Sequence, residues 1–193
     1  MTAASRVPTA GRAPARSTGQ FGVVVFLASD VMLFAPFFAA YLLLRSTNSL
    51  WPASGVELDV PRAGAATLVL IASSFTLLVA DRAHARGDAL AFRRWLLITI
   101  LFGLGFLANQ IAEYATLPFA ADDHVYGSIY WALTGLHAAH VLAGVSCLGL
   151  VFIRSARTRS ADEITPWVNG ASLFWHLVDV IWIAVFLLIW VLQ

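Results

Sequence analysis

The chain has 193 residues, of which 60% are hydrophobic and only 12% are charged. Soluble domains carry roughly 25% charged residues, so this composition excludes an ordinary soluble protein. The net charge of +1 does not favour a nucleic-acid partner, and the single cysteine excludes both an internal disulfide and a cysteine-based metal site.

Five apolar segments follow one another along the chain. Each is long enough to cross, as a helix, a hydrocarbon core roughly 30 Å thick. The segments cover residues 21–44, 63–80, 95–117, 127–153 and 168–192. The sequence therefore predicts an all-α fold, an integral membrane bundle of five transmembrane helices over 21–193. Residues 1–20 contain three arginines and no acid, and we expect them to form a flexible cytoplasmic tail.

The arginines predict the orientation of the helices. All twelve basic residues are arginine, and ten of them lie in the tail and in the connectors 81–94 and 154–167. Positively charged connectors stay in the cytoplasm. We therefore expect the N-terminus inside the cell and the C-terminus outside.

Asp30 is the ionisable residue of the first segment. It lies nine residues from the inner end, about 14 Å along a helix axis. A charged group inside a span is costly, so Asp30 is a candidate functional residue, proton-related or lipid-organising. A plain hydrogen bond to a neighbouring helix is the alternative. His137 and His140, three apart on one face of the fourth segment, are candidates for the same role, with hydrogen bonding between helices as the alternative. They lie at a depth comparable to that of Asp30, and we expect one of them to contact Asp30 within about 6 Å.

Two further polar pairs occur at helical spacing. Gln110 and Glu113 lie near the outer end of the third segment, and Glu113 is a candidate proton-related residue with a structural alternative. His176 and Asp179 lie near the middle of the fifth segment. We interpret His176 and Asp179 as a structural, hydrogen-bonding pair. No catalytic residue and no metal ligand is expected in this chain.

Four short stretches carry a family resemblance. They are FLASDVMLFA at 26–35, FLANQIAEY at 106–114, YGS with TGLHAAHV at 126–141, and WHLVDVIW at 175–182. In this order they resemble motifs of subunit III of the haem–copper respiratory oxidases, in its bacterial five-helix form. The resemblance covers the chain from about Phe21 to the C-terminus. Asp30 stands where that family usually has a glutamate.

The resemblance implies a supporting subunit of a cytochrome c oxidase in the bacterial plasma membrane. Such a subunit has no redox centre of its own, and it belongs to an enzyme only within the proton-pumping complex. Its partners would be subunits I and II, which carry haem and copper, membrane phospholipids and, more widely, a respiratory supercomplex. It would divide into two and three helices around a lipid-filled cleft and sustain proton uptake during oxygen reduction. Arg93, Arg94 and Arg154, at the inner boundary, are candidate contacts for lipid phosphates.

Three other functions stay open at this point. A quinol oxidase has a similar subunit III. A membrane cytochrome would use His137, His140 and His176 as haem ligands, which must face one macrocycle in pairs. A stand-alone transporter is the third, although the sequence has no internal repeat of the kind many transporters show.

Overall fold

The computed structural model describes residues 18–52, 56, 58–158 and 161–192, and this part of the chain is all-helical. The helices are α1 (Thr18–Thr47), α2 (Val60–Ala85), α3 (Ala89–Tyr114), α4 (Val125–Arg157) and α5 (Ala161–Phe186), and the short π-helix η1 (Leu187–Val191) continues α5. The tail predicted over 1–20 lies outside the described residues as far as residue 17. Residues 18–20 belong to the first turn of α1.

Five helices are long and apolar enough to cross a membrane, as the sequence predicts. At the end of the bundle that carries most of the arginines, every helix continues past its predicted apolar segment. Arginine is a good helix former, and its long side chain can reach water from a helix end. We call this end the arginine end, and the other the opposite end.

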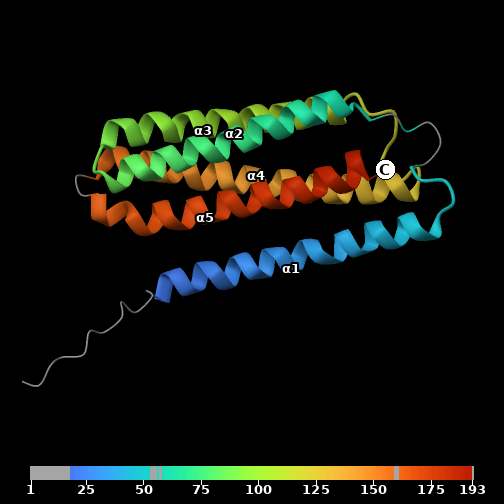
Figure 1. Cartoon of the computed structure of the whole chain (residues 1–193), viewed down its shortest axis with the longest axis horizontal. Helices are drawn as coiled ribbons and strands as arrows, with labels where there is room; N and C mark the ends of the chain where they lie inside the picture. Colours follow the sequence, from blue (N-terminus) through green and yellow to red (C-terminus); the bar gives the residue numbers. More distant parts are fainter. Residues whose placement is uncertain (1–17, 53–55, 57, 159–160, 193) are drawn as a thin grey trace, which may run out of the picture.

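Helices α2, α3, α4 and α5 form one bundle, and α1 lies along its side against α4 and α5 (Figure 1). The predicted division into two and three helices differs from this arrangement, because α1 alone is set apart. The reason is its narrow contact face. Among the described side chains of α1, only Asp30, Phe34 and Tyr41 are fully buried. Most of its other large apolar residues are exposed, as expected for a helix that faces lipid.

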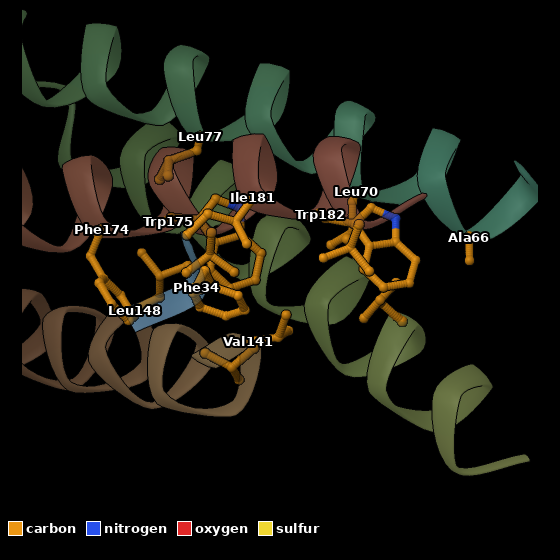
Figure 2. Close-up of a cluster of buried hydrophobic side chains, with 14 of the residues drawn as sticks. Phe34, Ala66, Leu70, Leu77, Val141, Leu148, Phe174, Trp175, Ile181 and Trp182 are labelled. Atoms are coloured by element: carbon orange, nitrogen blue, oxygen red, sulfur yellow. The ribbon is translucent and has the colours of Figure 1, made fainter. Parts of the chain in front are cut away.

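Trp175 of α5 lies at the centre of the bundle and is fully buried. Its Nε1 donates to Ser73 Oγ of α2 over 3.0 Å. A Cβ added to Gly103 of α3 or Gly144 of α4 would lie 2.5 or 2.8 Å from the indole. The two glycines therefore make the room that the ring needs between helices. Figure 2 shows Trp175 among the apolar side chains of this core.

The turn between α2 and α3 is fixed by Gly87 and Asp88. Gly87 has a φ of 74°, a conformation that glycine adopts at little cost. Its N–H donates to His84 O, and the N–H of Asp88 donates to Ala83 O, which is the Schellman pattern of a helix end. Asp88 then caps α3 by accepting from the N–H of Ala91. This turn sets α2 and α3 side by side and antiparallel.

Trp51 attaches the opposite end of α1 to the bundle. Its Nε1 donates to Tyr41 Oη at the C-terminal part of α1 over 3.3 Å. Its ring also meets Tyr126 of α4 edge-on, with centroids 5.0 Å apart. The chain after α1 thus folds back onto both helices, and it helps to set the height at which Asp30 faces α4.

Candidate functional site

Asp30 of α1 faces His140 of α4. The distance from Asp30 Oδ1 to His140 Nε2 is 3.8 Å, and Asp30 is only 6% exposed. His140 Nδ1 lies 2.8 Å from the backbone oxygen of Leu136, which can only accept, so Nδ1 carries a proton and donates it. Nε2 is left facing the carboxyl group. The predicted contact between Asp30 and one of the two histidines is present, and His140 is the partner.

Asp30 and His140 form an acid–base contact between α1 and α4. If His140 is neutral, its Nε2 is an acceptor for a protonated Asp30; if both are charged, they form an ion pair. Asp30 Oδ2 has no hydrogen-bond partner within the described residues. Phe34, one turn further along α1, packs edge-on against the imidazole with centroids 5.0 Å apart. Aromatic packing therefore covers one side of the pair and keeps its surroundings apolar.

His137 lies in a different environment from His140. It is fully buried between Phe106 of α3 and Trp182 of α5, with ring centroids 5.8 and 4.7 Å from its own. Neither of its ring nitrogens has a hydrogen-bond partner in the described part of the chain. The two histidines, although one turn apart, thus do not act on a common partner. Within the described residues there is no group of three or more His, Cys, Asp and Glu that could hold a metal ion.

Glu113 joins α3 to α4 near the opposite end of the bundle. Tyr130 Oη donates to Glu113 Oε1 over 3.1 Å, and both residues are buried. Tyr114, the next residue, donates to Thr134 Oγ1 one turn further along α4. These contacts are of the kind that fixes two helices in register. They connect Glu113 to no other described acid.

The second polar cluster lies between α2 and α5, and we call it the α2/α5 seam. It consists of Ser74, Asp81 and His84 of α2 with Thr165, Ser172, His176 and Asp179 of α5. His176 and Asp179 do not bond each other directly; both contact Ser74 Oγ, His176 through Nδ1 at 3.1 Å. The interpretation of His176 and Asp179 as one polar pair is therefore incomplete, because a serine of another helix lies between them.

Sequence reasoning missed most of the α2/α5 seam. Asp81 and His84 fall in the charged stretch after the second apolar segment and look like connector residues, but both belong to α2. Ser172 donates to Asp81 Oδ2 over 2.6 Å, and His84 Nε2 lies 2.9 Å from Thr165 Oγ1. The sequence signal that could have indicated the seam is a seven-residue spacing between polar residues. Ser74 and Asp81, like Thr165 and Ser172, lie two turns apart on one helix face.

The three candidate arginines for lipid differ in their surroundings. Arg93 donates to the backbone oxygen of Ser155 near the end of α4, so its guanidinium is already engaged within the protein. Arg94 is exposed. Arg154 lies over the ring of Trp167 in α5, 4.1 Å from the centroid, which is a cation–π contact.

An apolar groove lies beside Trp167, between α1, α4 and α5. Its volume is about 870 Å³, comparable to that of a site for a medium-sized ligand. Its lining includes Phe26 and Leu27 of α1, Ala143 and Cys147 of α4, and Gly170 and Phe174 of α5. The groove exists because α1 stands away from the bundle at the arginine end. Its walls are mostly apolar, and the guanidinium group of Arg154 lies over the ring of Trp167.

Comparison with known proteins gives one consistent result. The family described as "Cytochrome c oxidase subunit III" matches residues 10–193. The chain is 38% identical over 173 residues to "Cytochrome c oxidase subunit 3" of Thermostichus vulcanus, which covers 89% of this chain and 86% of that one. It is also 38% identical over 178 residues to the protein of the same name from Corynebacterium diphtheriae, covering 89% and 87%. A "Probable cytochrome c oxidase subunit 3" of Mycobacterium tuberculosis is 36% identical over 176 residues, with the same coverage.

Proposed function

The chain belongs to the cytochrome c oxidase subunit III family, and from that premise we propose how it supports the oxidase complex. It is a respiratory-chain protein of the bacterial plasma membrane and a partner of the other oxidase subunits. Its finer role is to sustain proton uptake and to organise lipid. Subunits I and II supply haem and copper. The observation that carries the proposal is the contact between Asp30 and His140, a buried acid and a partly buried base joining the separate helix α1 to α4.

Asp30 and His140 support proton uptake by keeping a carboxyl group and an imidazole together in an apolar place. Buried ionisable groups in a span are costly and are retained where they serve a function. The same pair also connects α1 to α4, so that loss of the acid would loosen this connection. During turnover a loosened α1 would let the complex inactivate sooner.

Replacing Asp30 in the whole complex tests this role. We expect Asp30→Asn to assemble and to start at near-normal activity, but to lose activity after fewer turnovers than the unaltered oxidase. Asp30→Glu is the matched control, because it keeps the acid and should keep the lifetime. Unchanged initial activity and lifetime in Asp30→Asn would contradict the proposed role of Asp30 in sustaining turnover.

The apolar groove beside Trp167 supports the lipid-organising part of the proposal. Its walls would accept an acyl chain, and Arg154, which lies over the ring of the lining residue Trp167, would meet a phosphate. Within the bilayer, a bound acyl chain would contact the helices through van der Waals packing. Occupancy would therefore hold α1 against α4 and α5.

Filling the groove tests lipid binding. Ala143→Phe, on the groove wall, should reduce the phospholipid that co-purifies with the complex, measured by mass spectrometry of extracted lipid. Leu142→Phe is the control, since Leu142 is exposed and does not line the groove. Equal lipid content in both variants would contradict a lipid in this groove.

The orientation follows from the arginines at one end of the bundle. Figure 1 shows the α2–α3 turn, the end of α4 and the start of α5 at the same end of the bundle. The described arginines there are Arg82, Arg86, Arg93, Arg94, Arg154 and Arg157. We place this end in the cytoplasm.

A further inference from the structure

Ser74 connects two ionisable residues of α5 through a single hydroxyl group. Its Oγ lies 3.1 Å from His176 Nδ1 and within hydrogen-bond distance of Asp179 Oδ2. A hydroxyl has one proton, so if Ser74 donates to one neighbour it can bond the other only by accepting from it. Two arrangements satisfy this condition, and they run in opposite directions.

One proton shift converts the first arrangement into the second. In the first, a protonated Asp179 donates to Ser74, which donates to Nδ1 of a neutral His176. When the O–H bond of Asp179 breaks, Ser74 takes that proton and passes its own to Nδ1. The result is a carboxylate and an imidazolium, with no change in total charge. The geometry of Asp179, Ser74 and His176 is therefore that of a short proton-transfer chain, which we call the triad.

Asp81 and His84 lie between the triad and the arginine end. Asp81 accepts from Ser172, one turn before His176 on α5, and it is close enough to interact electrostatically with both His176 and His84. His84 bonds Thr165 near the start of α5. Ionisable groups thus follow one another along the α2/α5 seam from the surface inward.

The charged groups around this entrance are exposed. They are Arg82 on α2 and Asp162 and Glu163 on α5. Beside the triad, α3 and α5 present Thr99 and Trp175, which bond Thr76 and Ser73 of α2 and do not titrate. The α2/α5 seam is therefore the polar path from this surface to the triad.

Several atoms of the α2/α5 seam keep free bonding capacity. Asp81 Oδ1, His176 Nε2 and Asp179 Oδ1 have no hydrogen-bond partner within the described residues, and Asp179 is only 6% exposed. Buried polar atoms are usually hydrogen-bonded, so these three atoms are free to bond a further donor or acceptor. Spare donors and acceptors on three successive groups are what proton transfer along the seam requires, directly or through a bridging water.

The path is closed beyond the triad. The next contact between α2 and α5 is Trp182 Nε1 donating to Thr67 Oγ1 over 3.0 Å. Figure 2 shows Trp182 and Leu70 at this level. From there to the opposite end, residues 63–73 of α2 and 180–191 of α5 contain no ionisable side chain. Along α2 and α5, a proton that reaches the triad therefore has no further ionisable side chain to pass to.

We propose that the α2/α5 seam is a blind proton relay. Asp81 and His84 exchange protons with water at the arginine end, and the triad holds one mobile proton deep within the membrane. This site is separate from the Asp30–His140 contact, and it goes beyond the supporting role proposed above. The relay binds and releases protons, and it needs an opening to water only at the arginine end.

Infrared spectroscopy of the purified oxidase complex tests the relay. The neutral arrangement is favoured in an apolar interior, so the spectrum should contain a protonated-carboxyl band that Asp179→Asn removes. Transfer into D₂O should shift this band. In Asp81→Asn and in Ser74→Ala the shift should be about tenfold slower, because the first variant loses a carboxyl group that can take up a proton and the second loses the hydroxyl group of the triad. Ser74→Thr keeps the hydroxyl and should exchange as fast as the unaltered protein.

Glu113→Gln is the control, because it removes a buried carboxyl group at the other end of the bundle. It should leave the Asp179 band and its exchange rate unchanged. If Asp179→Asn does not assemble, ¹³C-labelled aspartate separates the aspartate bands from those of glutamate, and the Asp81 and Ser74 variants decide. The absence of a protonated aspartate band, or equal exchange rates in Ser74→Ala and Ser74→Thr, would overturn the relay. The Asp30 experiment is unaffected by either result.

Discussion

Two glycines allow Trp175 to occupy the centre of the bundle. Gly144 of α4 lies under the indole, where a Cβ would be 2.8 Å from the ring, and Gly103 of α3 lies on another side of it. Added atoms in a packed interior force backbone or rotamer shifts. These glycines are therefore explained by the space that the ring occupies and not by backbone flexibility.

We expect Gly144→Ala to lower the free energy of unfolding by about 1–3 kcal/mol, since the new methyl group must displace Trp175. Thermal unfolding in detergent would measure it. Gly149→Ala on the same helix is the control, because a Cβ there meets nothing within 4 Å. It should be neutral or stabilising by about 0.5–1 kcal/mol. Equal effects of the two substitutions would contradict the packing explanation.

Tyr130 and Glu113 form a buried hydrogen bond. Removing one partner should destabilise the protein more than removing both. Tyr130→Phe leaves the Glu113 carboxyl group without its donor, and we expect a loss of about 1–3 kcal/mol in unfolding free energy. Replacing both residues, as Tyr130→Phe with Glu113→Met, should restore much of it, since no buried polar group is then unpaired. Thermal denaturation of the unaltered protein and of the two variants would measure this. If the double variant is the least stable, Glu113 has other partners.

At the scale of the helices, the α2–α3 turn depends on one backbone conformation. Gly87 has a φ of 74°, which costs other L-residues roughly 1–2 kcal/mol. We expect Gly87→Ala to destabilise the protein by about 1 kcal/mol. Gly87→Asn should be milder, because asparagine tolerates this conformation. The thermal midpoints of both variants would check the order, and an alanine variant as stable as the native protein would contradict it.

Which parts of the helices could be predicted depends on the physical signal behind each. Apolar length and arginine positions predict five helices, because crossing a membrane imposes a minimum length. The depth of Asp30 and His140 within their segments predicts their contact. Asp81 was missed because a charged residue beside Arg82 resembles a connector, although its α2 helix continues to Ala85.

The pairing of the helices could not be predicted in the same way. Each of these helices has apolar residues on all its faces, since lipid-facing and core-facing positions are both apolar. The position of α1 apart from the other four helices therefore leaves no clear pattern in the sequence. Likewise the place of Trp175 follows from small residues on two other helices, Gly103 and Gly144, which no local pattern connects to it.

At the scale of the whole molecule, the groove beside Trp167 and the entrance of the α2/α5 seam both lie at the arginine end. Both features lie where α5 begins, at His84 and Thr165 for the seam and at Arg154 and Trp167 for the groove. The lipid phosphate proposed for the groove and the protons proposed for the seam would both come from the side of the membrane that the arginine end faces. The orientation of the chain therefore bears on both proposals at once.

Reporter fusions measure this orientation directly. Alkaline phosphatase fused after the C-terminus should be active, because we place that end outside the cell, and a fluorescent protein at the same position should be dark. Fused in the α2–α3 turn after Arg86, the two reporters should give the reverse result, since we expect the arginines of this turn to stay in the cytoplasm. Fusion in the connection between α3 and α4, at Asp122, should match the C-terminus. If the turn after Arg86 were outside, the seam would open to the outer aqueous phase, and the relay would take its protons from there.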